Sequence, residues 1–271
     1  MASTSLYRCV LITGASSGLG AEFARQLAPV SKALVLVARR LERLKSLAAQ
    51  LEAASPGVQV HCLQADLTEI DQRESVLESI RSLKLEPDFL INNAGIGDYG
   101  EFLSSDWQKV ETMMRINMEA LTHLTHSSLA GMIKQGSGSI INVSSLAGIL
   151  AIPDFAVYAA TKAYVTSFSE ALRIELMGHS IKVLALCPGP VHTGFGQVAQ
   201  REEVSNVTPG GESVYVDAVQ VVEEALTAIQ KNKARHYPGK KIAFMAAVMS
   251  SVPVFLLRKM MSRRPRRSQS S

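Results

Sequence analysis

Apolar residues recur along this chain in two alternating patterns. Short consecutive apolar runs, rich in β-branched residues, are separated by stretches with apolar residues at helical spacing. The runs occupy residues 9–13, 33–37, 58–63, 89–91, 139–143 and 181–186. Consecutive apolar positions are typical of strands that are buried on both faces, and strands that alternate with helices are typical of parallel sheets. The pattern therefore predicts an α/β fold, a doubly wound parallel sheet of the Rossmann type with helices on both faces, in three layers.

The domain organisation follows from length and from one change of pattern. With 271 residues, the chain is long enough for one large domain or two small ones. We interpret residues 1–241 as a single domain and residues 242–271 as an apolar and then basic tail. The polar, turn-rich stretch at about 194–215 predicts a substrate loop, and an inert surface excursion is the alternative. Helical spacing returns over residues 216–231.

Composition and charge exclude several classes of protein. The content of 47% hydrophobic and 19% charged residues is that of an ordinary globular protein. Three cysteines are too few and too far apart for a disulfide framework, and the N-terminus has no secretory signal, which together predict a cytoplasmic protein. Six cations between residues 258 and 267 turn an otherwise negative chain into one with a net charge of +4, so no nucleic-acid partner is predicted for the domain.

The C-terminal tail has two interpretations. Residues 242–257 are mostly apolar and contain Pro253, and this stretch is short for a membrane span of about 20 residues. The first interpretation is a peripheral membrane contact, in which a helix lies on the membrane surface with arginines at anionic head groups. The second is a helix that closes the substrate pocket or packs in a subunit interface.

A glycine-rich turn follows the first predicted strand. Residues 13–20 read TGASSGLG, with Gly14, Gly18 and Gly20 directly after a strand and at the opening of a helix. Glycine lets the backbone approach a pyrophosphate, and the helix N-terminus presents unpaired N–H groups and the positive end of a dipole. The turn is therefore a candidate dinucleotide site.

Six further motifs follow this turn in a fixed order, and together they carry a family resemblance. They are Asp66-Leu67, Asn92-Asn93-Ala94-Gly95, Asn117, Ser144-Ser145, the run YAATK at 158–162 and the run PGPVHT at 188–193. In this order, from the first strand to Thr193, the chain resembles the short-chain dehydrogenase/reductase family. The resemblance implies an oxidoreductase with a nicotinamide cofactor that acts on a carbonyl or an alcohol.

Tyr158 and Lys162 are the candidate proton-transfer pair. They stand four residues apart, which on a helix places both side chains on one face about one turn apart. A phenol has an ordinary pKa near 10, and a neighbouring ammonium lowers it. The resemblance implies that Tyr158 is the general acid in reduction or the base in oxidation, and that Lys162 also hydrogen-bonds the nicotinamide ribose.

Two more residues complete the candidate catalytic set. Successive strand residues face opposite sides, so only one of Ser144 and Ser145 can point at the cofactor. The resemblance selects Ser145, which stands thirteen positions before Tyr158, and Ser144 is the alternative. Asn117 resembles the residue that holds a water in a proton relay; a satisfied polar group in the core would look the same.

The remaining motifs are implied to bind the cofactor. The candidate residues are Gly14, Ser16, Ser17, Gly18, Leu19, Gly20, Arg39, Asp66, Leu67, Asn93, Ala94, Gly95, Tyr158, Lys162, Pro188, Gly189, Val191 and Thr193. By resemblance, Asp66 contacts the adenine and the turn at 188–193 holds the nicotinamide carboxamide. The second strand ends without an acidic residue and is followed by Arg39-Arg40, and a guanidinium there pairs with a 2′-phosphate. This predicts NADP(H), and residues 1–241 are then an NADP(H)-binding catalytic domain.

The expected function is the interconversion of a carbonyl and a secondary alcohol on a small molecule. The apolar residues Ile149, Leu150, Ile152, Pro153 and Phe155, with Tyr99 and Phe102, predict an apolar substrate, acyl or steroid-like; simple packing is the alternative. The rival functions are a non-catalytic cofactor sensor or scaffold and a sugar epimerase or dehydratase. The resemblance also implies a homodimer or homotetramer. His123 and His126 have no third ligand nearby in the sequence, so no metal is predicted.

Overall fold

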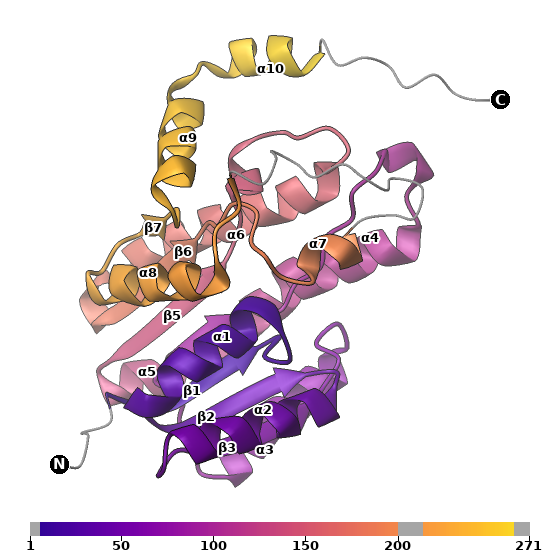
Figure 1. Ribbon diagram of the computed structural model, residues 1–271. Helices are drawn as coiled ribbons and strands as arrows, with labels where there is room; N and C mark the ends of the chain where they lie inside the picture. The colour runs from indigo at the N-terminus through magenta and orange to yellow at the C-terminus, as the bar shows by residue number, and fades with distance from the viewer. Residues whose placement is uncertain (1–5, 200–213, 263–271) are drawn as a thin grey trace.

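The computed structural model describes residues 6–199 and 214–262, and a seven-stranded sheet lies at the centre of this part of the chain (Figure 1). The strands are β1 (Tyr7–Thr13), β2 (Ser31–Ala38), β3 (Gln59–Gln64), β4 (Phe89–Asn92), β5 (Gly138–Val143), β6 (Ile181–Leu186) and β7 (Arg235–His236). The α-helices are α1 (Gly18–Leu27), α2 (Leu41–Ala54), α3 (Ile70–Ser82), α4 (Trp107–Met114), α5 (Leu121–Gln135), α6 (Ala156–Glu175), α7 (Phe195–Ala199), α8 (Ala218–Gln230), α9 (Lys240–Ser251) and α10 (Val254–Ser262). Shorter helical segments are η1 (Ala28–Val30), η2 (Phe102–Ser104), η3 (Arg115–Ala120), η4 (Leu146–Ile149) and η5 (Met177–His179).

All strand pairs in the sheet are parallel, in the order β3-β2-β1-β4-β5-β6-β7. Strand β1 pairs with β2 on one side and with β4 on the other. From β1 to β3 the strands are added in one direction across the sheet, and from β4 onward they are added in the opposite direction. The carboxyl ends of β1 and β4 form a topological switch point, which is where open α/β sheets bind ligands. The predicted fold class is confirmed.

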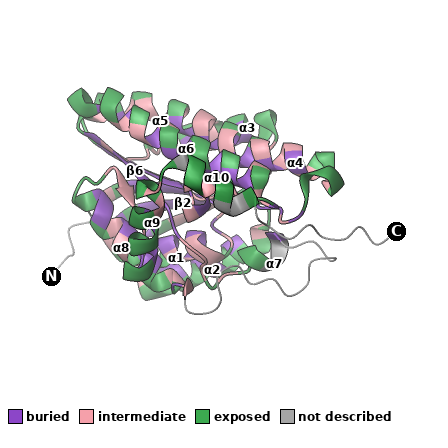
Figure 2. Cartoon of the chain, turned by 90° about the horizontal axis from the view of Figure 1, so that it is seen from above, coloured by how far each residue is buried: buried purple, intermediate pink, exposed green. Residues whose placement is uncertain are grey.

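Helices cover both faces of the sheet and make three layers. Figures 1 and 2 show α1, α2 and α8 on one face and α3, α4, α5 and α6 on the other. In β1, Val10 and Ile12 belong to one hydrophobic cluster, whereas Cys9 and Leu11 belong to the other. Because neighbouring strand residues face opposite layers that are both apolar, the strands read as unbroken apolar runs.

The structure differs from the predicted elements mainly near the C-terminus. Strand β7 has only two residues, Arg235 and His236, which are both half-buried, so no apolar run in the sequence predicts it. The predicted single tail helix is two helices, α9 and α10, separated at Val252 and Pro253. A residue that precedes proline is disfavoured in helical conformation, and Val252 is extended.

The predicted substrate loop at 194–215 is described only at its ends. Helix α7 occupies residues 195–199, and residues 200–213 lie outside the described part of the chain. Helix α8 lies within the predicted helical stretch 216–231. Among the described residues, no helix is both long and apolar enough to span a membrane.

Candidate active site

The turn between β1 and α1 brings its backbone very close to the end of β4. Gly14 has a φ of +65°, and a Cβ placed on it would lie 2.9 Å from the Cα of Ala94. A Cβ on Gly20 would lie 2.4 Å from the carbonyl oxygen of Gly14. These contacts admit no side chain, so the chain can pass this tightly from β1 into α1 only with glycine at both positions. We call this turn and the start of α1 the glycine cradle.

Hydrogen bonds hold this turn to the neighbouring strand. The hydroxyl of Thr13 accepts from the backbone N–H groups of Asn93 and Ala94, both at 3.0 Å. The Asn93 side-chain amide donates to the Thr13 carbonyl at 3.0 Å and to the Gly14 carbonyl at 3.3 Å. Asn93 therefore positions the glycine turn, and the switch point between β1 and β4 is cross-linked by polar groups.

The start of α1 has the electrostatics of an anion site. Its N-cap, Ser17, makes no side-chain capping hydrogen bond, and the first turn contains no acidic residue. The first backbone N–H groups of a helix have no intrahelical partner and carry the positive end of the dipole. Leu19 is half-buried against the core, and the side chain of Thr193 approaches Gly18 from the loop after β6. The site residues predicted on these two segments thus lie side by side.

Two adjacent arginines after β2, Arg39 and Arg40, make different contacts. Arg40 donates to the hydroxyls of Ser16 at 3.0 Å and Ser17 at 2.9 Å. Arg39, the arginine assigned from sequence, lies 3.8 Å from a carboxylate oxygen of Asp66. Desolvation and then the charges of Arg43 and Arg39 lower the pKa of Arg40, as expected for a cation among cations. This basic group beside a phosphate cradle fits a ligand that carries an additional phosphate.

The loop after β3 presents Asp66 at the same edge. Its carboxylate accepts from the Thr68 backbone at 3.0 Å and from the Thr68 hydroxyl at 2.8 Å. Leu67 is buried, and its carbonyl accepts from the fully buried Arg73 at 2.9 Å. Arg73 also pairs with Glu119, which lies two residues after Asn117. This buried cation ties the Asp66 loop to the segment that carries Asn117, and no motif in the sequence predicted it.

Helix α6 carries Tyr158 and Lys162 on one buried face. Both are among its buried residues, and the Lys162 ammonium lies 5.6 Å from the centre of the Tyr158 ring. Burial raises the pKa of Tyr158 to about 12, and a hydrogen bond with the Ser145 side chain acts in the opposite direction. This differs from the expected lowering by Lys162, because the cost of desolvating the phenolate dominates.

Lys162 is held in place by a backbone group. Its ammonium donates to the carbonyl of Val143, the last residue of β5, at 2.9 Å. Burial lowers the pKa of Lys162 to about 8, so the side chain is still mostly protonated at neutral pH. A buried cation with one hydrogen-bond partner is available to a second polar group at the same site.

The two adjacent serines after β5 face different environments. The Ser144 hydroxyl is buried, donates to the Lys162 carbonyl at 2.7 Å and lies 2.7 Å from the Thr166 hydroxyl. The Ser145 side chain hydrogen-bonds Tyr158 and accepts from the Ala147 backbone at 3.1 Å. Geometry therefore favours Ser145 over Ser144 as the serine that faces the proton-transfer pair.

Asn117 lies in η3, a π-helical segment between α4 and α5. Its amide bonds both backbone groups of Ile96 at 3.0 Å and donates to the Thr161 hydroxyl at 3.0 Å. A Cβ on Gly95 would lie 2.9 Å from the side-chain oxygen of Asn117 and 3.5 Å from the Lys162 nitrogen. π-Helical segments such as η3 are frequent at functional sites. The hydrogen bonds of Asn117 tie the loop after β4 to α6.

An aromatic group surrounds Tyr158. Phe155 stacks on its ring at 4.3 Å between centroids, and Phe195 of α7 approaches it at 5.8 Å. Tyr99 lies edge-on to Phe155 at 5.6 Å. Of the predicted apolar residues, Phe102 is 60% exposed and points to no such role. Tyr99 and Phe155 were predicted from the sequence, whereas Phe195, which lies inside the predicted loop at 194–215, was not.

The loop after β6 closes the site on its other side. The Pro188 carbonyl accepts from the Leu146 backbone at 2.8 Å, and Val191 forms a parallel bridge with Val216. A Cβ on Gly189 would lie 2.5 Å from Ile242 of α9, so the tail begins against this loop. Burial raises the pKa of the neighbouring Cys187 thiol to about 11, which keeps it protonated.

The helix histidines remain separate from this site. His123 lies 3.2 Å from a carboxylate oxygen of Glu74 on the α3 side of the sheet. In the part of the chain that the structure describes, no cluster of three or more histidine, cysteine, aspartate or glutamate side chains could hold a metal ion.

Comparison with known proteins finds relatives that match most of this chain. The family model described as short chain dehydrogenase matches residues 8–204. The sulfoacetaldehyde reductase of Chromohalobacter salexigens is 35% identical over 225 residues, which cover 81% of this chain and 83% of that protein.

Two solved structures match nearly the whole chain. A short-chain dehydrogenase from Sphingobium yanoikuyae in complex with NADPH has a TM-score of 0.77 at 31% identity and covers 97% of this chain and 98% of its own. The bulky-bulky ketone specific alcohol dehydrogenase from Comamonas testosteroni has a TM-score of 0.76 at 28% identity and covers 99% and 98%.

Proposed function

The chain belongs to the short-chain dehydrogenase family, and from this we propose that it is an NADP(H)-dependent oxidoreductase that interconverts a carbonyl and a secondary alcohol. The observation that carries the proposal is the buried face of α6 that Tyr158 and Lys162 share, with the Lys162 ammonium 5.6 Å from the centre of the Tyr158 ring and the Ser145 side chain beside Tyr158. These groups lie at the same edge of the sheet as the glycine cradle. The NADPH complex of the Sphingobium protein supports the choice of cofactor.

The residues of the cradle fit this cofactor. Gly14 and Gly20 let the chain turn tightly into α1, whose first N–H groups suit a pyrophosphate, and Arg40 with Arg39 supplies cations for a 2′-phosphate. When bound, the nicotinamide supplies or accepts the hydride. In our proposal Asp66 faces the adenine, and the loop from Pro188 to Thr193 faces the nicotinamide, as the sequence analysis predicted.

Tyr158 provides the proton in the direction of reduction. Its raised pKa keeps the phenol protonated at rest, and the Ser145 hydroxyl shares the hydrogen bond that polarises the substrate oxygen. The Lys162 ammonium, with a pKa of about 8, stabilises the phenolate that forms when the proton leaves. Asn117 holds the loop after β4 against α6 and so keeps this pair aligned.

An apolar ketone, acyl or steroid-like, is the proposed substrate class. The rings of Phe155, Phe195 and Tyr99 surround Tyr158 and offer an apolar wall to the group attached to the carbonyl. The specificity of the Comamonas relative for bulky ketones supports this choice.

A comparison of wild type with Tyr158→Phe tests the proposal. The wild type should bind NADPH more tightly than NADH and oxidise NADPH in the presence of an apolar ketone. The variant should lose at least about a thousandfold in kcat and keep its NADPH affinity, because only the proton donor is removed. Tight NADPH binding by the wild type without turnover of any ketone would instead favour a cofactor sensor or scaffold.

The predicted homodimer or homotetramer and the predicted cytoplasmic location stay predictions. Light scattering after gel filtration measures the first, and cell fractionation measures the second.

A further inference from the structure

The C-terminal arm, which we define as α9 and α10 (residues 240–262), stands away from the sheet (Figure 1). It has an inner and an outer face with different chemistry. On the inner face, Ile242 and Ala246 are buried, and Ile242 packs against Gly189 in the loop after β6. The start of the arm therefore packs against the loop after β6.

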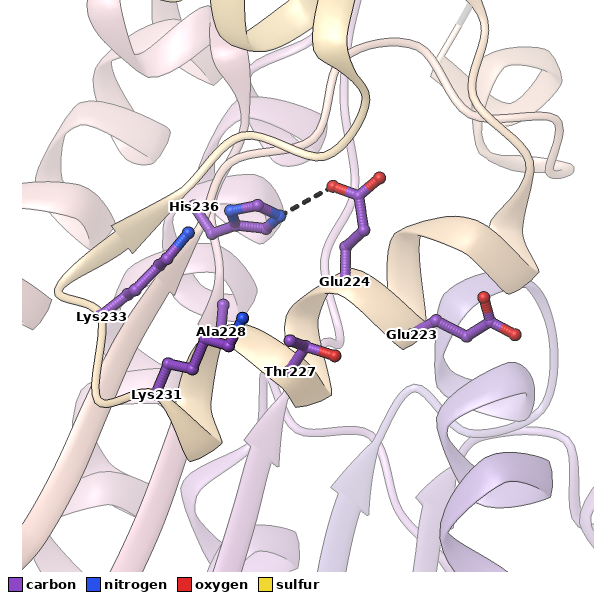
Figure 3. Close-up of a pocket in the computed structure, with 7 residues that line it drawn as sticks. All are labelled: Glu223, Glu224, Thr227, Ala228, Lys231, Lys233 and His236. Carbon is purple, nitrogen blue, oxygen red and sulfur yellow. Dashed lines mark hydrogen bonds and ion pairs between the residues drawn. The ribbon is translucent and has the colours of Figure 1, made fainter.

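The base of the arm is fixed by polar contacts. Figure 3 shows Glu224 of α8 with its carboxylate directed at His236 of β7, and the two lie 2.9 Å apart. The same carboxylate accepts from the backbone of Gly239, immediately before α9, at 3.1 Å. Desolvation opposes ionisation of this group, but hydrogen bonds from Gln220, Gly239 and His236 outweigh it and lower the pKa of Glu224. With its base anchored, the arm presents a defined outer face.

That outer face is apolar and exposed. Phe244 is 72% exposed and Phe255 is 67% exposed, and Met245, Val248 and Leu256 are also exposed. These two phenylalanines lie on separate helices, and most of the surface of each is in water. No described residue of this chain buries them. A cluster of this kind marks a contact with an apolar phase or another molecule.

The charge on the arm identifies the partner. Lys240, Lys241 and Lys259 are exposed, and the sequence from Ala225 to the end contains no acidic residue. Between residues 240 and 267 the chain has eight lysines and arginines. Apolar side chains beside cations match the acyl and head-group regions of an anionic bilayer. A symmetric contact between two arms would instead bring like charges together without any compensating acid.

We propose that the C-terminal arm docks this protein on the surface of an anionic lipid bilayer, with Phe244 and Phe255 in the acyl boundary and the lysines at the head groups. Ile242 of the arm contacts Gly189, so docking places the loop after β6 toward the lipid, from which an apolar ketone partitions. The docking itself is independent of the function proposed above.

Vesicle flotation of the full chain tests this proposal. Wild type should float with vesicles of two parts phosphatidylcholine to one part phosphatidylglycerol and not with phosphatidylcholine alone. About 0.5 M sodium chloride should weaken the binding. Lys240→Gln with Lys241→Gln should reduce the partition coefficient about fivefold for each lysine, and Phe244→Ser with Phe255→Ser at least about tenfold.

Matched variants separate docking from general surface effects. Met177→Ser removes an equally exposed apolar side chain, and Lys32→Gln with Lys134→Gln removes two exposed cations from elsewhere on the surface. Both controls should float like wild type, and every variant should retain the wild-type melting temperature. Absence of wild-type flotation on anionic vesicles would overturn the proposal, as would equal losses in the arm and control variants. The wild type could instead be a dimer that binds no lipid and that Phe244→Ser with Phe255→Ser converts to a monomer. That result would overturn the proposal and show that the outer face contacts a second copy of the chain.

Discussion

Two sides of the candidate active site, the turn after β1 and the aromatic group around Tyr158, are held by different forces. The turn after β1 is fixed by hydrogen bonds between Thr13 and Asn93, and its glycines contact backbone atoms. The aromatic group is held by apolar contacts, with the rings of Phe155 and Phe195 at 4.3 Å and 5.8 Å from the Tyr158 ring between centroids. Each hydrogen bond requires particular groups in a particular geometry, whereas an apolar contact requires only the right volume.

This difference matches the ligands that we assign to the two sides, the cofactor to the turn and the substrate to the aromatic group. A dinucleotide offers the same phosphates in every relative, so a turn of fixed geometry suits it. Substrates vary, and a wall of aromatic and aliphatic side chains can be changed without disturbing the turn. The comparison therefore predicts that changes on the glycine side affect cofactor binding and changes on the apolar side affect substrate.

The largest effect is expected at Lys162, whose ammonium lies beside the Tyr158 ring. Lys162→Met should reduce kcat by at least about a thousandfold, because the variant cannot stabilise the Tyr158 phenolate. The variant should nevertheless be more stable at pH 7, by about 2 kcal/mol, because it removes a buried charge at the cost of one hydrogen bond to Val143.

The pH dependence of that gain has a defined sign. The folded-state pKa of Lys162 is about 8, below the ordinary value of 10.5. Between these values the unfolded state holds more protons at Lys162, so the contribution of this residue to the wild-type free energy of unfolding should rise with pH. Urea denaturation at pH 7 and near pH 10 should show the advantage of the variant disappearing at the higher pH. A variant that is less stable at both pH values would contradict the burial argument.

A smaller effect is expected at the glycine turn. Gly14→Ala places a Cβ at 2.9 Å from backbone of Ala94 in a left-handed conformation, so it should lower the free energy of unfolding by about 2 kcal/mol. NADPH affinity, measured by fluorescence titration, should fall about a hundredfold. Gly178→Ala, where a Cβ would meet nothing within 4 Å, is the control and should keep wild-type affinity.

The arginine pair sharpens the assignment of the phosphate site. Arg40→Ala should weaken NADPH binding about thirtyfold, the range of a charge-assisted hydrogen bond, and leave NADH binding unchanged. Arg39→Ala should have a weaker effect, because Arg39 pairs with Asp66 and does not contact the glycine turn. Equal losses for NADPH and NADH would show that Arg40 supports the turn and does not read a 2′-phosphate.

The smallest effect is expected on the apolar side. Phe195→Ala removes one ring beside Tyr158 and should raise the KM for an apolar ketone about tenfold, with NADPH affinity unchanged. Steady-state kinetics at saturating NADPH measure this. A loss of NADPH affinity comparable to that of Gly14→Ala would contradict the proposed division between a cofactor side at the glycine turn and a substrate side at the aromatic group.

The sequence predicted the sheet and the glycine turn because both depend on local rules. Strands buried on two faces produce apolar runs, and a close backbone approach demands glycine at Gly14 and Gly20. The spacing of Tyr158 and Lys162 likewise follows from the geometry of one helix.

The contacts that the sequence did not predict join distant segments. Arg40 and Arg39 are adjacent, and only the folded turn shows which one reaches Ser16 and Ser17. Strand β7 is too short to have a pattern, and Phe195 meets Tyr158 across 37 positions of chain. The high pKa of Tyr158 depends on burial, which a spacing of four residues does not specify.

The central claim is that hydride passes from the cofactor to a carbonyl carbon while Tyr158 supplies the proton. The most direct measurement is a turnover with NADPH deuterated at nicotinamide C4, followed by mass spectrometry of the alcohol formed from an apolar ketone. The account predicts one deuterium on the carbinol carbon with the wild type and a trace of product with Tyr158→Phe. An alcohol whose carbinol hydrogen comes from solvent, or undiminished deuterium transfer by the variant, would contradict it.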